Sequence, residues 1–583
     1  MALNVRQKQA EVVLRVLNFN SATGKETSSE SYKVLVLDRF TKDIVAPLLR
    51  LNDLRKHGVT LHLMLENERQ PIPDVPAVYL VQPSPANIER ITADAVAGLY
   101  DSMYLNFTVS VPGKLVEQLA GGVVKAGCLS RINKLYDQYL SFIALEPTLF
   151  SLGQPEVYVE LNDPQARDYQ IEATVGNVVD GLFSVCVTLG VVPIIRCPRG
   201  GAAEHIASAL DSKLRDALKS RTNLFSESVL GLSASLSRPL LCLFDRNFDL
   251  SAAVQHAWTY KPLVQDVLGL KLNRIALQAE ASGPGPAGMM AASAGAAVLD
   301  KHTNIATSLL GAIKMRALDQ YFNTAEDLLV GKADLQAVLK LLQSGKGAPM
   351  DKLRLAIIYI LAYDGLPSDH ELSELENIMR TGGADVTALQ YVRTLKRNNL
   401  TGSGGKGGGG AEAMGHHAGA PAASQTNLLD WADKTFGQGL SQVAKGVKTL
   451  LSGERGGAWA RGCGGGGASG GWACTKRARQ APLAVCMEAL MEGKAGTPEF
   501  DSYTVFDPKL PPGRASLERA KGPFRESIVF MIGGGNYYER ETLLTWAGRC
   551  TPPRQVLYGA TELLSGEEFV QQLSELGRRS GGR

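Results

Sequence analysis

The chain has 583 residues, which is too long for one hydrophobic core and predicts two to four domains. Its content of 45% hydrophobic and 20% charged residues is typical of a globular protein and excludes wholesale disorder. Lys plus Arg (61) nearly balances Asp plus Glu (58) and no long basic run occurs, so nucleic acid is not an expected partner.

The cysteines and histidines predict no metal site. No two of the eight cysteines have the C-x-x-C or C-x4-C spacing that presents two thiolates to one metal. The eight histidines include no His-Glu-x-x-His pair. Scattered cysteines in apolar runs fit a reducing cytosol without structural disulfides.

No segment of the sequence is predicted to cross a membrane. The longest apolar run, residues 181–195, is shorter than the ~20 residues that span a bilayer, and Pro193 breaks its end. We interpret this run as a buried helix that leads into a strand. We therefore expect a soluble protein whose contact with membranes is indirect, through partners.

The first 150 residues predict an α/β domain. After a short N-terminal helix, apolar runs at 32–37, 59–65 and 77–81 alternate with helical or Pro-rich segments, which indicates a parallel sheet covered on both faces. The stretch 115–150 is predicted to be helical and to close the domain. Its candidate packing positions are Leu115, Leu119, Ile132, Leu135, Tyr139 and Ile143.

Residues 151–275 and 481–583 predict the two halves of a second α/β domain. The first half has helices at 171–189 and 202–219 and strands at 192–195 and 238–244. The second half has strands at 527–532 and 555–558 and a closing helix at 566–576. In the simplest topology the C-terminal part returns to the sheet that begins near residue 190.

The segment between these halves, 276–480, predicts a helical third domain. Apolar residues at three- and four-residue spacing indicate helices at 304–318, 328–342, 353–363 and 371–380. Three tracts rich in Gly, Ala and Ser interrupt the domain at 279–297, 401–424 and 453–471. Such sequence buries too little apolar surface to offset the entropy of ordering, so we interpret the tracts as linkers.

A nucleotide site is the main alternative that the motifs raise. Gly533, Gly534 and Gly535 follow a strand and precede a helix, the arrangement in which backbone amides cradle a phosphate. However, Tyr538 stands where a dinucleotide motif has its third glycine, and no Gly-Lys-Ser/Thr occurs. A tight turn is the preferred interpretation, and a nucleotide-binding α/β enzyme remains the alternative.

Two aspartates at strand ends, Asp38 and Asp245, could in principle bind Mg²⁺ or accept a phosphoryl group. Neither has a second acid beside it in a pattern such as Asp-x-Asp, so we expect each to cap the following loop. The sequence thus predicts no catalytic residue, no metal and no cofactor. A large chain of this kind is expected to bind other proteins.

Several motifs resemble those of the SM family, the Sec/Munc-like proteins that bind syntaxins and guide SNARE assembly. The strongest is the run 238–250, RPLLCLFDRNFDL, followed by HAWTY at 256–260 and LVQDVL at 263–268. Further matches point to the Sly branch, which serves ER–Golgi transport. They are at 17–20, 72–79, 104–107, 136–140, 192–196 and 530–537.

The resemblance implies a non-catalytic scaffold shaped as an arch, with two parallel-sheet α/β domains and a helical third domain inserted in the second. In this family the first domain commonly grips an N-terminal syntaxin peptide, and the central cavity holds the SNARE bundle. The implied protein is a monomer that regulates vesicle docking and membrane fusion. It is cytoplasmic and associates peripherally with ER and Golgi membranes through its partners, a syntaxin-type SNARE and the assembled bundle.

The resemblance also suggests roles for particular residues. Peptide capture needs an apolar pocket with a polar rim, and Leu115, Leu119, Ile132 and Leu135 are the candidate wall. The same four residues could instead be core. Trp258 and Tyr260 are expected to fix packing rather than touch a partner. The remaining signature residues, with a structural role, are Asp245, Arg246, Gly533, Gly534 and Gly535.

The chain departs from the family at one place. Between Ile275 and Val298 the Sly branch normally carries a longer segment, including part of a helical hairpin thought to template vesicle SNAREs, whereas this chain has only an Ala/Gly/Pro-rich tract. An adaptor that binds syntaxin but does not drive fusion is therefore a further alternative.

Overall fold

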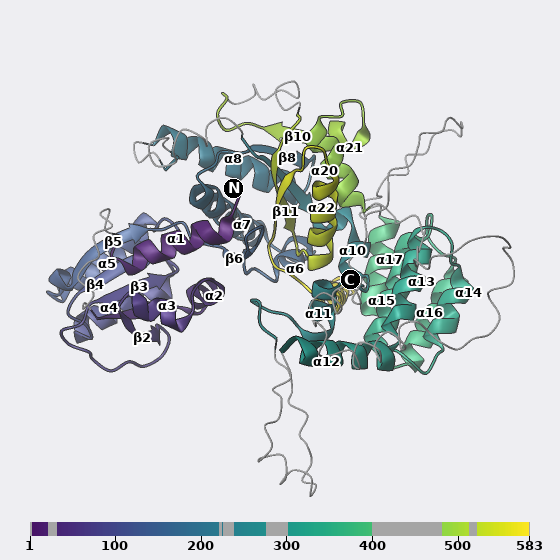
Figure 1. Cartoon of the computed structure of the whole chain (residues 1–583), viewed down its shortest axis with the longest axis horizontal. Coiled ribbons are helices and arrows are strands. Elements are labelled where there is room, and N and C mark those ends of the chain that lie inside the picture. The colour runs from purple at the N-terminus through teal and green to yellow at the C-terminus, as the bar shows by residue number, and fades with distance from the viewer. Residues whose placement is uncertain are drawn as a thin grey trace, which may run out of the picture.

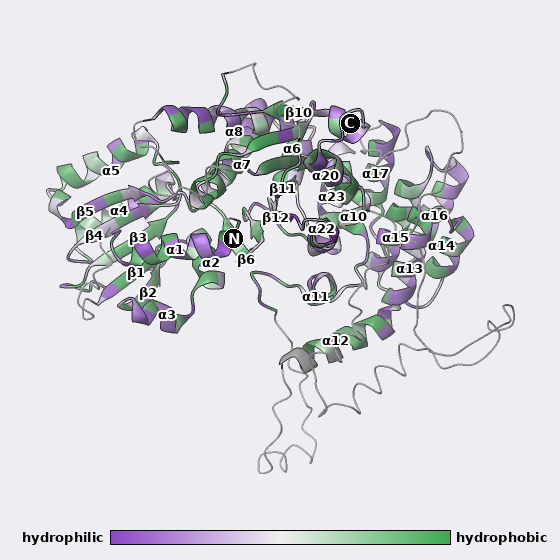
Figure 2. Ribbon diagram, turned by 45° about the horizontal axis from the view of Figure 1, so that its top comes forward, coloured by the Kyte–Doolittle hydropathy of each residue, from purple (hydrophilic) through white to green (hydrophobic). Residues whose placement is uncertain are grey.

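The computed structural model describes residues 3–20, 32–220, 224–225, 238–275, 301–398, 481–511 and 522–581. Three parts follow one another in Figure 1: an N-terminal sheet with its helices, a larger central sheet, and a group of helices. They form an arch with two α/β parts and one helical part (Figure 2). The Gly/Ala/Ser tracts at 279–297, 401–424 and 453–471 lie outside the described residues.

The first sheet is parallel, with the order β2-β1-β3-β4-β5. Its strands are β1 Lys33–Leu37, β2 Val59–Met64, β3 Ala77–Val81, β4 Met103–Phe107 and β5 Ile132–Asp137. The helices around it are α1 Val5–Leu17, α2 Arg39–Leu48, α3 Leu51–Lys56, α4 Pro85–Ala97 and α5 Gly113–Lys125. Separate apolar clusters cover its two faces, and every residue of β1 and β3 is buried. The predicted parallel sheet, covered on both sides, is confirmed.

The helix predicted over 115–150 is wrong beyond Lys125. Gly127, with φ of 68°, lies just past the end of α5, and the chain then forms the short 3-10 helix η1 Leu129–Arg131 and strand β5. Two further strands follow, β6 Ile143–Glu146 and β7 Leu149–Ser151. The apolar spacing resembled a helix, but pairing of β5 with β4 and of β7 with β12 decides the conformation.

The central sheet has seven strands in the order β10-β8-β9-β11-β12-β7-β6. Its remaining strands are β8 Ile194–Pro198, β9 Leu240–Asp245, β10 Tyr503–Phe506, β11 Glu526–Ile532 and β12 Gln555–Ala560. β9 and β11 are parallel neighbours, with Leu240 opposite Ser527. The predicted return of the C-terminal part to the sheet begun near residue 190 is confirmed. β6 and β7 belong to this sheet, although their residues were assigned to the 1–150 domain.

Helices cover both faces of the central sheet: α7 Asp168–Leu189 and α8 Ala202–Lys219 pack on one face, and α20 Pro482–Glu492 and α22 Tyr537–Arg549 on the other. The same part of the chain also contains α6 Val157–Asn162, α10 Leu250–Val254, α11 Tyr260–Leu268, α21 Pro498–Asp501, α23 Gly566–Ser580 and a 3-10 turn, η3 Arg246–Phe248, which follows β9. By length and composition α7 is the one helix in the described part of the chain that could cross a membrane. Here it packs inside the core with side chains of β9 and α8, as predicted for a buried helix.

The helical part comprises α12 Lys301–Arg316, α13 Leu318–Leu329, α14 Leu335–Leu342, α15 Pro349–Ala362, α16 Asp369–Thr381 and α17 Thr387–Arg397. The single helix predicted over 328–342 is wrong. Gly331, with φ of 70°, and Asp334, whose side chain caps the Ala337 amide, separate α13 from α14. α15 is buried around most of its circumference, and α17 packs against the closing helix α23.

A buried ion pair joins the two halves of the central sheet. Arg246, which follows β9, donates to both carboxylate oxygens of Glu539 in α22, at 3.0 and 2.8 Å, and their side chains are 0% and 3% exposed. The guanidinium also donates to the Gly534 carbonyl, and Tyr558 donates to the same carboxylate at 2.7 Å. The charges are therefore compensated by each other and by hydrogen bonds.

Removing one partner of this pair should destabilise the protein strongly. We expect Arg246→Leu to lower the free energy of unfolding by about 3–5 kcal/mol, because the Glu539 carboxylate is then buried without compensation. The double variant Arg246→Leu/Glu539→Leu should recover a large part of the loss, measured by urea unfolding. Lys8→Ala, at an exposed pair with Glu11, is the control and should change the midpoint little. Equal destabilisation by the single and double variants would contradict the proposed origin.

Candidate functional site

The four residues predicted to line a peptide pocket lie on two elements at one edge of the first sheet. Leu115 and Leu119 are on α5, and Ile132 and Leu135 are on the edge strand β5. Leu135 is in register with Leu105 of β4, which belongs to the apolar cluster on the α4–α5 face. Because paired residues point to the same face, Leu135 lies on the side of the sheet that α5 covers.

Burial separates these residues into core and surface. Leu119 is 4% exposed and is part of the core, and Leu115 and Ile132 are half-buried and pack against it. Leu135 is 37% exposed. The two interpretations left open by the sequence thus apply to different residues: Leu119 is core, whereas Leu135 presents an apolar side chain to solvent.

Two exposed residues that sequence reasoning missed extend this surface. Val116 of α5 is 38% exposed and Leu129 of η1 is 54% exposed. Gly122 packs so closely on Thr92 of α4 that an added Cβ would meet Thr92 Cγ2 at 2.6 Å. Val116 lies on the opposite flank of α5 from Gly122 and therefore faces the β5 edge. The helical wheel of α5 could have revealed it, because it flanks Leu119.

We call Val116, Leu129, Ile132 and Leu135 the α5–β5 surface. Leu115, two helical turns before Gly122, lies on the flank of α5 that faces α4. The rim of the α5–β5 surface is polar and held in place. The Asp137 carboxylate at the end of β5 accepts hydrogen bonds from the Ser110 hydroxyl at 2.9 Å and the Val111 amide at 3.2 Å. Within the described residues β5 pairs with β4 alone. The arrangement offers apolar contacts beside an open strand edge, which suits an extended or helical peptide.

The glycine loop that suggested a nucleotide site is filled by the protein itself. The amides of Gly533 and Gly534 donate to the Thr561 hydroxyl at 3.1 and 3.0 Å, and the Gly535 amide donates to the Glu562 carbonyl at 2.8 Å. Gly533 and Gly534 have φ of 87° and 102°, which favours glycine. The loop is a tight turn between β11 and α22 whose amide donors are already used.

The two strand-end aspartates both cap helices. Asp38 caps α2 by accepting from the Thr41 amide at 2.8 Å, as predicted. Asp245 instead accepts from the Ala203 amide at 3.1 Å, in the first turn of the upstream helix α8. Burial raises the pKa of Asp245 to about 6, against the opposing effect of that hydrogen bond. No group of three His, Cys, Asp or Glu side chains placed to hold a metal occurs among the described residues.

The aromatic residues of the 256–260 motif have packing contacts. The Trp258 ring stacks on Phe322 of α13 at a centroid distance of 5.7 Å. Tyr260 begins α11 and lies against the small apolar cluster that joins α11 to α12. His256 in the same motif is buried beside Asp351, with 3.0 Å between Nε2 and Oδ1. The motif therefore connects the central sheet to the helical part.

A five-stranded parallel sheet, a second sheet assembled from distant segments and a helical insertion define an SM-type scaffold. The Sec1 family model matches residues 33–290 and 291–572, so the chain belongs to the Sec1 family. It is 40% identical to the SEC1 family transport protein SLY1 of Arabidopsis thaliana, over all of this chain and 98% of the relative. It is 32% identical to the human Sec1 family domain-containing protein 1, and the alignment covers 99% of this chain and 98% of the human protein.

A solved structure, that of Sly1p in complex with an N-terminal peptide of Sed5p, has the same architecture. Its TM-score is 0.74 at 27% identity, with 100% of both chains covered. The family and fold that the sequence motifs indicated are thus confirmed.

The raised pKa of Asp245 predicts a specific pH dependence. The ordinary aspartate pKa is about 3.9, so between that value and about 6 the folded protein binds a proton that the unfolded chain has released. This contribution to stability is complete below pH ~4 and is lost as the pH rises through about 6.

Asp245→Asn keeps the oxygen that accepts from the Ala203 amide but cannot ionise. We expect the variant to lose this part of the pH dependence, so that its stability relative to wild type rises by roughly 2–3 kcal/mol from pH 4 to 7. Urea unfolding at both pH values measures the difference. A constant difference between variant and wild type would contradict the proposed ionisation.

Proposed function

We propose that this protein binds a syntaxin-type SNARE and regulates vesicle docking and membrane fusion in ER–Golgi transport, as a non-catalytic scaffold. Membership of the Sec1 family supports this, together with the full-length likeness to SLY1 proteins and to Sly1p solved with a Sed5p peptide. The single observation that carries the proposal is this whole-chain match. We further infer that the protein is cytoplasmic and reaches ER and Golgi membranes through its SNARE partners.

The α5–β5 surface is the proposed site for the N-terminal peptide of that SNARE. Leu135 and Val116 present apolar side chains against which an anchoring side chain of the peptide can be buried. The core residue Leu119, on the same helix as Val116, packs beneath them. The Asp137 carboxylate at the end of β5 provides a polar rim. Peptide capture at a preformed surface needs no rearrangement of the sheet.

A charge at Leu135 should weaken binding of a syntaxin N-terminal peptide. We expect Leu135→Glu to reduce the affinity by about tenfold or more, because a carboxylate would be buried against the apolar anchor. Leu61→Glu is a matched control: Leu61 is 41% exposed on β2, the opposite edge strand of the same sheet. Calorimetry with a Golgi syntaxin N-terminal peptide measures both. Equal affinities of the two variants would place the peptide elsewhere, and no binding to wild type would argue against the function.

The adaptor alternative also has an observation in its favour. The alignment with the Arabidopsis relative runs over 658 positions, whereas this chain has 583 residues, so the relative contains segments that this chain lacks. The sequence places one such loss between Ile275 and Val298, and residues 276–300 lie outside the described residues.

Reconstituted fusion distinguishes the two functions. A fusion regulator is expected to accelerate lipid mixing between liposomes that carry a syntaxin-type SNARE and its partner SNAREs. Leu135→Glu should reduce the acceleration at limiting protein concentration, because less protein is recruited to the syntaxin. Peptide binding without any acceleration by wild-type protein would instead support the adaptor.

A further inference from the structure

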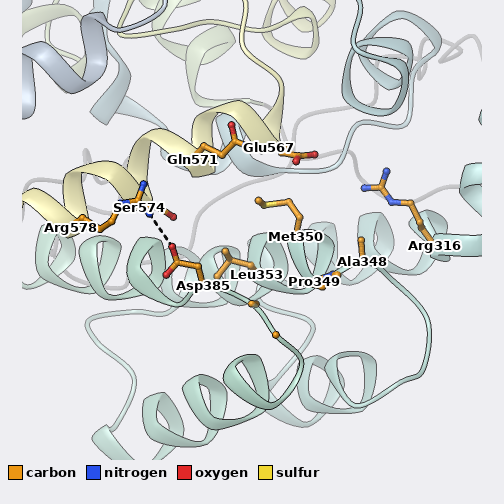
Figure 3. Close-up of a pocket in the computed structure, with 12 residues that line it drawn as sticks. Arg316, Ala348, Pro349, Met350, Leu353, Asp385, Glu567, Gln571, Ser574 and Arg578 are labelled. Carbon is orange, nitrogen blue, oxygen red and sulfur yellow. Dashed lines mark hydrogen bonds and ion pairs between the residues drawn. The ribbon is translucent and has the colours of Figure 1, made fainter. Parts of the chain in front are cut away.

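A groove of about 490 Å³ lies between the closing helix α23 and the start of α15 (Figure 3). Its volume is within the range of ligand-binding pockets. One wall consists of Glu567, Gln571, Ser574 and Arg578, whose spacing places them on one face of α23. Half-buried Met350 of α15 contributes apolar surface opposite this wall, whereas Leu353 is 2% exposed and belongs to the core beneath it. The groove lies in the helical part of the arch, far along the chain from the α5–β5 surface.

The two arginines that line the groove are paired with carboxylates, whereas the carboxylate of Glu567 is not. Arg316 Nε donates to Asp351 at 2.8 Å, and Arg578 Nη1 donates to Asp385 at 3.3 Å, so both arginines are paired. The exposed Glu567 carboxylate makes no ion pair or hydrogen bond with another described residue and interacts with Arg316 only at longer range, and Arg316 is itself paired with Asp351. The lining thus has one negative charge available to a ligand, which favours a cation close to Glu567.

The polar groups in the middle of the wall are also available. The side chains of Gln571 and Ser574 make no hydrogen bond with any other described residue. Gln571 is exposed, whereas Ser574 is 7% exposed. A side-chain amide next to apolar surface can donate one hydrogen bond and accept another.

The protein itself shows how a helix glutamine holds an extended backbone. Gln9 of α1 donates through Nε2 to the Phe142 carbonyl at 2.5 Å and accepts through Oε1 from the Ala144 amide at 2.9 Å. Both bonds reach the backbone at the start of β6. Gln571 offers the same donor and acceptor from α23, beside apolar surface and with no chain yet bound to them.

We propose that this groove binds an extended peptide segment of a partner protein. The peptide backbone pairs with the Gln571 amide as β6 pairs with Gln9, and an aliphatic side chain packs on Met350. A Lys or Arg two residues away pairs with Glu567. The distance between the two contacts is similar on both sides. Four residues of helix from Gln571 to Glu567 cover ~6 Å, and two residues of an extended peptide cover ~6.6 Å.

Short peptides on the full-length protein test the proposal. The probes are fluorescein-labelled Thr-Leu-Thr-Lys-Thr and the reverse order Thr-Lys-Thr-Leu-Thr, which cover both chain directions, and the analogues with Glu in place of Lys. By fluorescence anisotropy we expect one Lys peptide to bind saturably. Its Glu analogue should bind about tenfold more weakly, because its carboxylate faces Glu567. No saturable binding of either Lys peptide would overturn the proposal.

Two variants test whether the Gln571 amide and the Glu567 carboxylate bind the peptide. Gln571→Leu should weaken the Lys peptide by about tenfold, through loss of two hydrogen bonds, and Glu567→Gln should reduce the preference for Lys over Glu to about twofold or less. Gln343→Leu, at an exposed glutamine just after α14 and outside the groove, should bind as wild type. Wild-type affinity in Gln571→Leu, or an unchanged Lys preference in Glu567→Gln, would overturn the proposal. Neither result depends on syntaxin binding at the α5–β5 surface.

Discussion

The buried contact between Arg246 and Glu539 is the constraint on which the rest of the architecture depends. The two residues are 293 positions apart, and both are removed from water. A buried charge is tolerated only when its partner and its hydrogen bonds are in place. These exist only after β11 has paired with β9, because Arg246 follows β9 and Gly534, whose carbonyl it also contacts, follows β11. A chain whose C-terminal half had not returned to the central sheet would therefore leave both charges uncompensated.

The helical part is attached to the central sheet by a second set of buried polar contacts. Arg354 of α15 donates to both carboxylate oxygens of Asp266 at 2.9 Å, and to the carbonyls of Val254 and Gln255 at 2.7 and 2.9 Å. Asp351, one turn earlier, is held by Arg316 and His256. These contacts fix direction as well as position, since a planar guanidinium bonds in a fixed fork. The central sheet and the helical part thus present surfaces of set geometry, which suits a protein that works by binding other chains.

The family motifs act mainly at these junctions rather than at the surface proposed to bind peptide. The run 238–250 supplies β9 and Arg246, the 256–260 motif packs on α13, and the glycine loop brings its amides onto Thr561. Each glycine of that loop is enclosed by other side chains, for example Gly535 by Tyr558. The features that resembled a nucleotide site are therefore consequences of close packing at the carboxyl ends of the central strands. The α5–β5 surface, in contrast, consists of ordinary aliphatic residues on the first sheet.

The sequence by itself determined β1, β2 and β3 of the first sheet, β8, β9, β11 and β12 of the central sheet, the split of the second domain and the family, because apolar runs and family motifs are local patterns. Only the tertiary structure decided that β5 is a strand at a sheet edge, that Leu119 is core while Leu135 is exposed, and that Asp245 caps α8. In each case the outcome depends on a partner distant in the chain or on position within the sheet. The apolar spacing of residues 132, 135, 139 and 143 is compatible with a helix. Residues 132–137 nevertheless form a strand, because they pair with β4, a neighbour that the local sequence pattern does not contain.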